Sequence, residues 1–374
     1  MCSQIPKTIA VVVLAGAGCA ADLDGPTPSL AQVAITPAIV CSQQASTMLD
    51  IRGKNFSPVP ANVPDKPRLL LPTFTLERRA LLDGSKGSRV KLTYSGDPEA
   101  SDNAKALHWL SETHMQATLE RGRLQAGVYD ARVVNPNAEE ATAEAALTVV
   151  DKPSFATQAE LLVCDSRAEQ EITIEGSNFL KTKDGLPTLQ VDGQSGALSV
   201  GELSECTALD VGALCSRALL TSTGQLAVGT YEAKLVNPEP AACQTDETLR
   251  IRVIAGPQLE SDPVDSVCLR GQTRVLVVRG KGFQDVDGAW PSATLAGKAA
   301  TVVALDDCDP DVGAMRSCKK LQIELPLGNL APSEGATTLV VTNPAPTSCS
   351  ASASVQLRDL LQRDGSGDKT CSTR

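Results

Sequence analysis

Cysteine is the residue type in this chain whose number and spacing could do the most chemistry. The 374 residues include twelve cysteines, and two pairs lie close together, Cys206 with Cys215 and Cys308 with Cys318. Zinc sites use cysteine or histidine ligands separated by about two to four residues. The wider spacings here predict disulfides that close a hairpin or a loop, and they argue against zinc.

The two histidines, His108 and His114, are six residues apart. Two imidazoles at this spacing could bind a metal or serve as a base, but we interpret them as ordinary residues beside a strand. The sequence contains no Gly-x-Ser-x-Gly elbow, no His-Glu-x-x-His helix and no glycine-rich phosphate loop. It therefore predicts no catalytic residues, no cofactor and no enzyme activity.

Acidic residues are densest at four positions that could supply oxygen ligands to calcium. They are Asp306, Asp307, Asp309 and Asp311. Aspartate followed by glycine, which recurs elsewhere in the chain, is also ordinary turn chemistry. Without an array of alternating carboxylates we favour turns, and these four residues remain candidates only.

A locally basic stretch stands out in an acidic chain, which has 44 acidic and 34 basic residues and a net charge of −10. It includes Lys66, Arg68, Arg78 and Arg79. The stretch could dock an acidic partner or a polysaccharide, or it could be a solvated loop or added hairpin. Trp290 could stack against a sugar, or it could cover its own core. The overall charge argues against nucleic acid as a partner.

Three stretches of the chain repeat one pattern, and this repetition predicts how the candidate residues are positioned. Cys41, Cys164 and Cys268 each stand twelve residues before a glycine that we expect to open a short turn. The turns are Gly53-Lys54-Asn55-Phe56, Gly176-Ser177-Asn178-Phe179 and Gly280-Lys281-Gly282-Phe283. Further on, three glycines each precede an Asn-Pro pair by eight residues: Gly127 and Asn135, Gly229 and Asn237, Gly335 and Asn343. A fixed period indicates three copies of one module.

Apolar residues alternate before each turn and before each Asn-Pro pair, which predicts half-buried strands. The inward positions before the turns are Leu49 and Ile51, Ile172 and Ile174, and Leu276 and Val278. We expect positive φ at Asn55, Asn178 and Gly282, and a phenylalanine core residue directly after each. Short alternating strands with turn signals at this spacing predict antiparallel β-sandwiches.

The Gly-x-Asn-Phe turn, the downstream Gly-x-Tyr and the Val-x-Asn-Pro strand resemble the IPT/TIG family of immunoglobulin-like domains, and Ile35-Thr36-Pro37 resembles the opening of such a domain. The resemblance implies an all-β chain of three tandem Ig-like sandwiches. The expected segments are a signal peptide (1–18), a tether (19–30), Ig-like domains over 31–151 with an insertion, 152–255 and 256–358, and a flexible tail (359–374).

The remaining cysteines are placed by the repeat. Cys243 and Cys349 each lie six residues after an Asn-Pro asparagine, and we predict the bonds Cys164 to Cys243 and Cys268 to Cys349. Each would remove roughly 4 to 5 kcal/mol of unfolded-state entropy in the chain-entropy model. In the first copy Ala141 stands at the closing position. Cys41 and Cys371 are then either paired with each other or free.

The start of the chain reads as an export signal that ends at Cys19. A short apolar run is followed by Leu14-Ala15-Gly16-Ala17-Gly18-Cys19, which resembles a bacterial lipobox, although Gly16 stands where an apolar residue is usual. Ordinary cleavage after Ala17 is the alternative, and it would leave a soluble periplasmic or secreted protein. We expect lipidation at Cys19, with the outer membrane or cell surface as the location and the lipid as the sole membrane contact.

These features predict a non-catalytic envelope lipoprotein that acts as an adhesin, a spacer or a scaffold for an envelope or surface protein. A polysaccharide-binding surface lipoprotein is the alternative, and a secreted hydrolase is a third class for which signature residues are missing. The sequence does not identify the partner, the membrane leaflet, the oligomeric state or a dependence on calcium.

Overall fold

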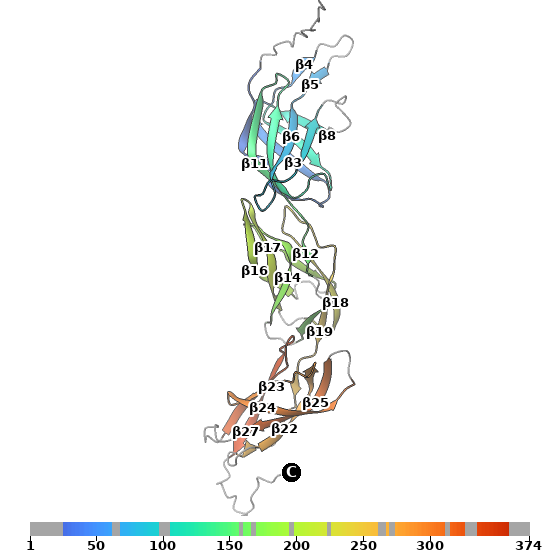
Figure 1. Cartoon of the computed structure of the whole chain (residues 1–374), viewed down its shortest axis with the longest axis vertical. Helices are drawn as coiled ribbons and strands as arrows, with labels where there is room; N and C mark the ends of the chain where they lie inside the picture. The colour runs from blue at the N-terminus through green and yellow to red at the C-terminus, as the bar shows by residue number, and fades with distance from the viewer. Residues whose placement is uncertain are drawn as a thin grey trace, which may run out of the picture. The chain divides into compact units, whose positions relative to one another are not determined.

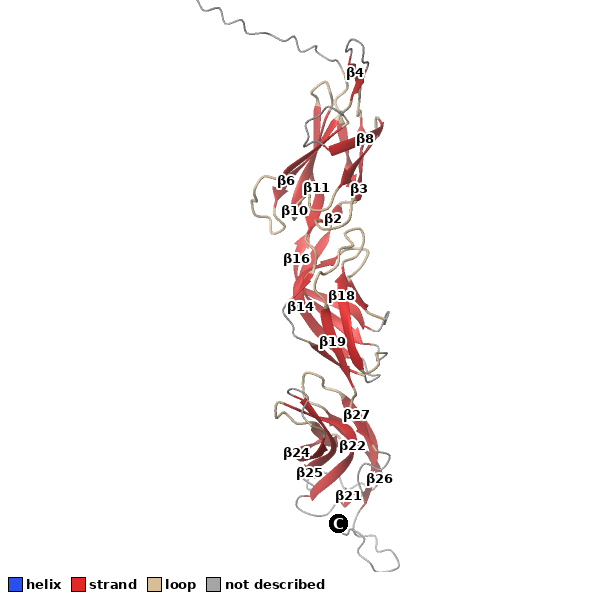
Figure 2. Ribbon diagram, turned by 90° about the vertical axis from the view of Figure 1, so that its right-hand side faces the viewer, coloured by secondary structure: helices blue, strands red, loops and turns tan. Residues whose placement is uncertain are grey.

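The computed structural model describes residues 25–61, 68–96, 105–156, 160–165, 170–193, 198–222, 226–260, 267–268, 274–310, 315–325 and 335–358. These residues form strands and connecting loops (Figures 1 and 2). The chain divides into two compact units, Met1–Val150 and Asp151–Arg374. The predicted all-β class is confirmed, whereas the signal peptide, Cys19 and Cys371 lie outside the described residues.

The first unit contains a nine-stranded sheet whose two halves pack on one core, with the strand order β1-β3-β9-β8-β7-β6-β10-β11-β2. Its pairs are antiparallel apart from β2 with β11 and β7 with β8. A small second sheet pairs β4 with β5. The strands are β1 (Ser29–Thr36), β2 (Ile39–Cys41), β3 (Thr47–Lys54), β4 (Val59–Ala61), β5 (Arg68–Leu70), β6 (Thr73–Ala80), β7 (Lys91–Ser95), β8 (Lys105–Ser111), β9 (His114–Leu119), β10 (Gly127–Val134) and β11 (Glu140–Val150).

The second unit repeats one arrangement of sheets twice. First, the sheet β12-β14-β17-β16 packs with the sheet β13-β19-β18-β15 around one core. The strands are β12 (Ser154–Phe155), β13 (Leu161–Cys164), β14 (Gln170–Lys181), β15 (Thr188–Val191), β16 (Leu198–Leu209), β17 (Gly212–Ser222), β18 (Gly229–Val236) and β19 (Leu249–Ile254).

The same strand order follows in an eight-stranded sheet, β20-β22-β25-β24-β23-β26-β27-β21, in which pairing of β23 with β24 joins the two halves. The strands are β20 (Gln258–Leu259), β21 (Val267–Cys268), β22 (Arg274–Val286), β23 (Ser292–Leu295), β24 (Lys298–Cys308), β25 (Met315–Leu325), β26 (Gly335–Thr342) and β27 (Ser350–Arg358). This repeat has its own core. The boundary between domains 152–255 and 256–358 remains a prediction.

The four-residue motifs that begin at Gly53, Gly176 and Gly280 are called the landmark of each copy. Their first glycine is needed because the backbone of another strand passes directly over it. A Cβ on Gly176 would lie 2.2 Å from the carbonyl oxygen of Ser154 and 2.4 Å from the Phe179 ring. Gly53 and Gly280 meet a carbonyl oxygen at the same 2.2 Å. No side chain fits at this separation, so the first short strand of each copy can pair only across glycine.

The predicted positive φ is confirmed, at 60° for Asn55, 58° for Asn178 and 76° for Gly282. The phenylalanines that follow these residues are fully buried. The predicted turn is wrong in the second unit, where β14 and β22 continue through the landmark and the register shifts before Phe179 and Phe283. The extra residues form a bulge that lets the ring enter the core while the strand stays paired.

In the second unit the asparagine of each Asn-Pro pair holds this bulge through its side-chain amide. In the second copy, Asn237 donates from Nδ2 to the Asn178 carbonyl (2.9 Å) and accepts at Oδ1 from the Leu180 amide (3.0 Å). Asn343 makes the matching pair of bonds, at 2.8 Å and 3.1 Å, to Gly282 and Gln284. We call this pair of bonds the asparagine clamp. In the first copy Asn135 donates to the Asn55 carbonyl (2.7 Å) and to the Pro26 carbonyl (3.2 Å), but its Oδ1 has no partner among the described residues.

The Gly-x-Tyr landmark also has a structural role. The Tyr129 hydroxyl donates to the Gln125 carbonyl (2.7 Å), and the Tyr231 hydroxyl donates to the Ala227 carbonyl (2.9 Å). A tyrosine near the start of a strand that bonds back to upstream backbone is the tyrosine corner of immunoglobulin-like sandwiches. The strand pairing and these corners make the sandwiches Ig-like.

The two short-range disulfides are confirmed. Cys206 bonds to Cys215, which lies directly opposite it in β16 and β17, and Cys308 bonds to Cys318 in the same way in β24 and β25. The Cα atoms of each pair are 3.9 Å apart. Both bonds therefore join the two strands of a hairpin.

The predicted bonds Cys164 to Cys243 and Cys268 to Cys349 are wrong, because Cys164 bonds to Cys349. Parallel pairing places Cys164 beside Ile254, at the end of the six-residue β19, whereas Cys243 precedes the start of that strand. Six residues of strand span roughly 20 Å, far beyond the Cα separation of about 7 Å that a disulfide allows.

The same geometry separates the cysteines of the last copy. Cys268 lies opposite Arg358, the final residue of β27, and Cys349 directly precedes the first residue of that nine-residue strand. Each pair predicted within one copy thus lies at opposite ends of its last strand.

The asparagine clamp predicts unequal costs for one substitution in different copies. Asn237→Ala leaves the Leu180 amide and the Asn178 carbonyl buried without their partners, and should destabilise the surrounding sandwich by about 2 to 4 kcal/mol. Asn135→Ala, the matched control, removes two donated hydrogen bonds but leaves no backbone amide without its acceptor, and should cost less. Native-state hydrogen exchange of β14 and β18, and of β3 and β10, would measure both. Equal losses would contradict the clamp.

Candidate functional site

A cluster of polar side chains that includes both candidate histidines lies on the outward face of β3, β9 and β8. Asp50 stands opposite Gln116 in one strand pair, and His108 stands opposite Gln116 in the next. Side chains directly opposite each other share a face, and His114 joins them two residues along β9. The structure therefore brings the two histidines to one face, as outward residues of strands.

Asp50 is the centre of this cluster. Its Oδ1 lies 2.7 Å from His114 Nε2 and accepts a 2.8 Å hydrogen bond from Gln116 Nε2. The Asp50 side chain is 35% exposed. The hydrogen bonds from Gln116 and then His114 outweigh partial burial and hold the pKa of Asp50 below its ordinary value.

A carboxylate beside a histidine can orient the imidazole for general base chemistry, but that chemistry also requires a group to deprotonate. Among the described residues, no serine, threonine or cysteine side chain is hydrogen-bonded to His114. The cluster presents polar groups on a flat sheet surface.

The arginines of the basic stretch are largely held within the first unit. Arg78 donates to the Ser88 carbonyl (2.7 Å) and to Gln125 (3.1 Å). Arg79 forms ion pairs with Glu144 (2.7 Å) and Asp130 (3.5 Å). These contacts tie β6 to its neighbours and reduce the positive charge available to a partner. Arg68 begins β5, and Lys66 lies outside the described residues.

The insertion that carries the basic stretch adds the hairpin β4-β5 and the strand β7 to the first copy. Strand β7 pairs with β6 and joins the two halves of the nine-stranded sheet through β8. The insertion is thus an added hairpin and an added strand, as the alternative of an added hairpin predicted. Its use as a docking surface stays a prediction.

The two tryptophans differ in role. Trp109 donates from Nε1 to the Phe56 carbonyl (2.7 Å) and packs on the core of the first unit. Trp290 lies in the connection between β22 and β23 and is 41% exposed. Trp290 therefore keeps a surface that could stack on a ligand, whereas Trp109 is an anchor for the landmark turn.

The candidate calcium ligands face different partners. Asp306 accepts from Gln322 (2.6 Å), Asp307 lies 3.7 Å from Lys320 Nζ, and Asp309 lies 3.8 Å from Lys319 Nζ. Asp311 lies outside the described residues. In the described part of the chain, no group of three or more histidine, cysteine or acidic side chains is placed to hold a metal ion.

Exposed valines on β22 and β24 were not predicted from the sequence; β25 lies between these strands and places Glu324 and Gln322 opposite Val275 and Val277. Val275, Val277 and Val303 are 54%, 42% and 36% exposed. The equivalent positions of Val275 and Val277 in the second copy are Glu171 and Thr173. Apolar residues at both the inward and the outward positions of 275–278 are the signal that could have revealed the exposed valines of β22.

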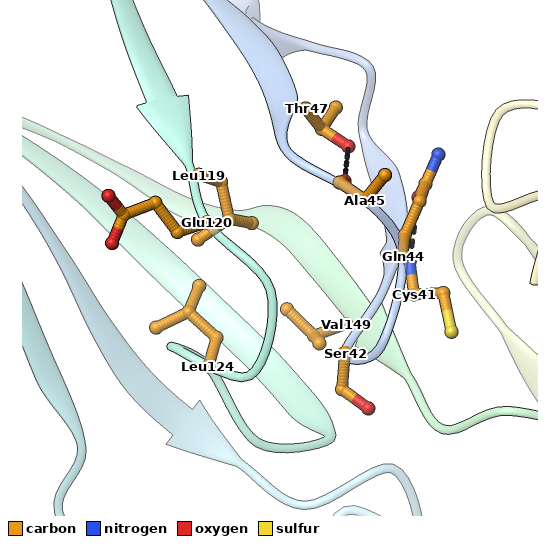
Figure 3. A pocket seen from close by; sticks show the side chains of 9 residues that line it. All are labelled: Cys41, Ser42, Gln44, Ala45, Thr47, Leu119, Glu120, Leu124 and Val149. Atoms are coloured by element: carbon orange, nitrogen blue, oxygen red, sulfur yellow. Dashed lines mark hydrogen bonds between the residues drawn. The ribbon is translucent and has the colours of Figure 1, made fainter.

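A hollow at one end of the first unit is too small for an organic ligand. It lies between the loop after β2 and the end of β9, with Leu119, Leu124 and Val149 at its base (Figure 3). Its room is about 10 Å³, roughly the space of one water molecule.

No protein family model matches the chain, and no curated protein matches it. Solved structures with a similar fold include the N-terminal eight Ig domains of Down syndrome cell adhesion molecule, at 13% identity and a TM-score of 0.24, over 89% of this chain and 42% of that chain. The insect immune protein hemolin matches at 13% identity and a TM-score of 0.24, over 89% and 77%.

A Bacteroides ovatus protein of a mixed-linkage glucan utilisation locus, SGBP-B, solved with a mixed-linkage heptasaccharide, matches at 12% identity and a TM-score of 0.19. That match covers 86% of this chain and 66% of that one. Likenesses of this size carry no argument about ligands or partners. The fold assignment rests on the strand pairing of the chain itself.

The Asp50 cluster predicts a measurable titration. Its hydrogen bonds stabilise the ionised carboxylate, so this contribution to stability is complete above the ordinary aspartate pKa of about 4 and is lost as the pH falls through the lowered value. Carboxyl chemical shifts followed by NMR should give Asp50 a pKa below its ordinary value. Gln116→Ala should raise that pKa, whereas Thr118→Ala on the same face should leave it unchanged. An unshifted pKa in the native chain would contradict the cluster.

Proposed function

We propose that this chain is a non-catalytic envelope lipoprotein that serves as an adhesin, spacer or scaffold through tandem Ig-like modules. The observation that carries the proposal is the use of the repeated landmark residues. Glycine, phenylalanine and asparagine at these positions connect the two faces of each sandwich, and a tyrosine corner adds to this in the first two copies, so what is repeated is a stable building unit. Repetition of such a unit extends a chain and presents its loops and outward faces.

The disulfides support an exported location. Eight cysteines in the described part of the chain are disulfide-bonded, and such bonds form and persist in oxidising compartments. The export signal and the lipidated Cys19 complete the proposal from sequence alone, since both lie outside the described residues. No helix that could cross a bilayer occurs among the described residues.

Polysaccharide binding is the second candidate, and one observation favours it. Trp290 exposes an aromatic surface on a short connection between two strands. The outward polar groups Asp50, His108 and Gln116 offer hydrogen bonds of the kind that sugars use, although they belong to another part of the chain.

The anchor is tested by locating the protein in cells. Cys19→Ser should shift the chain from the membrane fraction to the soluble fraction, and mass spectrometry of the native protein should find acyl chains on Cys19. The matched control is a serine at Cys2, which precedes the apolar run and should change neither result. A native chain that is cleaved after Ala17 and carries no lipid would contradict the anchor.

The partner class is tested by co-purification from crosslinked envelopes, followed by glycan arrays. An adhesin or scaffold should recover a defined envelope protein, and Trp290→Ala should leave that recovery unchanged. A polysaccharide binder should instead bind glycans on the array and lose this binding in Trp290→Ala, but not in Leu110→Ala, which changes another exposed apolar residue. Recovery of no protein together with Trp290-dependent glycan binding would overturn the proposed role in favour of the second.

A further inference from the structure

Two covalent connections join the sandwiches of the second unit. The first is the peptide chain, in which only residues 255–257 separate β19 from β20. The second is the disulfide between Cys164, the last residue of β13, and Cys349, which directly precedes β27. The Cα atoms of these cysteines are 5.8 Å apart, and both residues are 1% exposed. The joint between the two sandwiches is therefore crossed twice by covalent bonds.

The two connections run side by side. Parallel pairing places Cys164 beside Ile254, the residue at which β19 ends and the connecting segment begins. Neighbouring strands lie about 4.8 Å apart. A Cβ on Gly256, in the middle of the segment, would lie 3.3 Å from the Cys164 sulfur and 3.7 Å from the Cβ of Cys349. The connecting segment thus packs directly on the disulfide.

Hydrogen bonds hold the connecting segment to the first of the two sandwiches. Asp165 donates from its backbone amide to the Ile254 carbonyl (2.9 Å) and accepts at Oδ1 from the Gly256 amide (2.7 Å). Asp165 directly follows Cys164. One dipeptide therefore carries both the disulfide and the hydrogen bonds that fix the segment.

The other half of the disulfide is fixed in the second of the two sandwiches. The Cys349 carbonyl accepts from the Asn343 backbone amide (2.8 Å), and the side chain of Asn343 is the clamp that bonds to the Gly282 carbonyl (2.8 Å). Gly282 also contacts the connecting segment, since a Cβ there would lie 2.8 Å from the Gly256 carbonyl oxygen. The disulfide, the segment and the clamp of this sandwich therefore meet at one place.

We infer that the disulfide between Cys164 and Cys349 locks this joint and holds the two sandwiches of the second unit in one orientation. Domains joined by a short segment alone move relative to each other unless their interface is large and apolar. A second connection beside the first prevents one sandwich from turning about the segment. The packing of Gly256 between Cys164 and Gly282 opposes bending across the two connections.

A locked joint makes the second unit one rigid body, which adds a fixed geometry to the proposed role as a spacer or scaffold. The lock depends only on residues of this unit, so it does not rest on the anchor, the export signal or the partner. Failure of the envelope experiments would leave it standing.

The test measures the spread of distances between the two sandwiches by single-molecule energy transfer in the full chain. Dyes are attached through noncanonical amino acids at Glu202 and Lys298, which are exposed residues of the first and the second sandwich of this unit. The native chain should give one narrow distribution of transfer efficiency. Cys164→Ser together with Cys349→Ser should broaden it, because the sandwiches then turn about residues 255–257. Equal widths in the two chains would overturn the inference.

A matched control removes a disulfide from the same unit and leaves the joint intact. Cys206→Ser together with Cys215→Ser opens a hairpin bond within one sandwich, and should leave the distribution as narrow as in the native chain. Broadening by this pair as well would show general loosening of the unit and would count against a lock at the joint. Variants are preferred to a reductant, which would also open the hairpin bonds and the disulfide of Cys243.

The native chain alone provides a test if the joint variant does not fold. A broad distribution of transfer efficiency in the native chain would overturn the inference. Mass spectrometry of an unreduced digest should find the Cys164 peptide linked to the Cys349 peptide, and a link from Cys164 to any other cysteine would overturn it as well.

Discussion

The hydrogen bonds of one buried asparagine side chain hold the two faces of a sandwich in register in this protein. The Asn237 and Asn343 amides each bridge the two backbone groups on either side of the buried phenylalanine that follows a bulge in the facing sheet. The bulge exists because a glycine must let another strand pass, and it aims a phenylalanine ring into the core. Glycine, ring and asparagine therefore meet at one place in each copy, and they recur together along the chain.

The disulfides connect different parts of the fold from those that the asparagine clamp connects. The hairpin bonds at Cys206 and Cys308 each fix two strands that already pair, whereas the bond between Cys164 and Cys349 joins the start of one sandwich to the end of the next. A short strand pairs in parallel with the last strand of each copy in the second unit. This pairing places the first cysteine far from the closing cysteine of its own copy, so a bond within the copy cannot form. Local packing and long-range linkage are thus specified by separate residues.

Much of the fold could be predicted from sequence because its signals are local. Alternation placed Ile174 and Val278 in their cores, and residue type predicted positive φ at Asn55 and Asn178. The cysteine partners depend on which end of a strand a residue occupies, and spacing alone does not contain that information. Ala141 was the available clue, because a first copy without a closing cysteine is at odds with bonds that close within one copy. The Asp50 cluster could not be predicted from the sequence either, because the register between strands decides which side chains, here Gln116 and His114, meet the Asp50 carboxylate.

The central claim is that the repeated asparagine is a buried clamp between the sheets, and the protection of its side-chain amide protons tests this most directly. In NMR spectra of the intact chain, the Nδ2 protons of Asn237 and Asn343 should exchange with solvent at least about a hundredfold more slowly than those of Asn137, a partly exposed asparagine directly after Pro136, because a buried hydrogen bond must open before exchange occurs. Exchange of all three at the same fast rate would contradict the account.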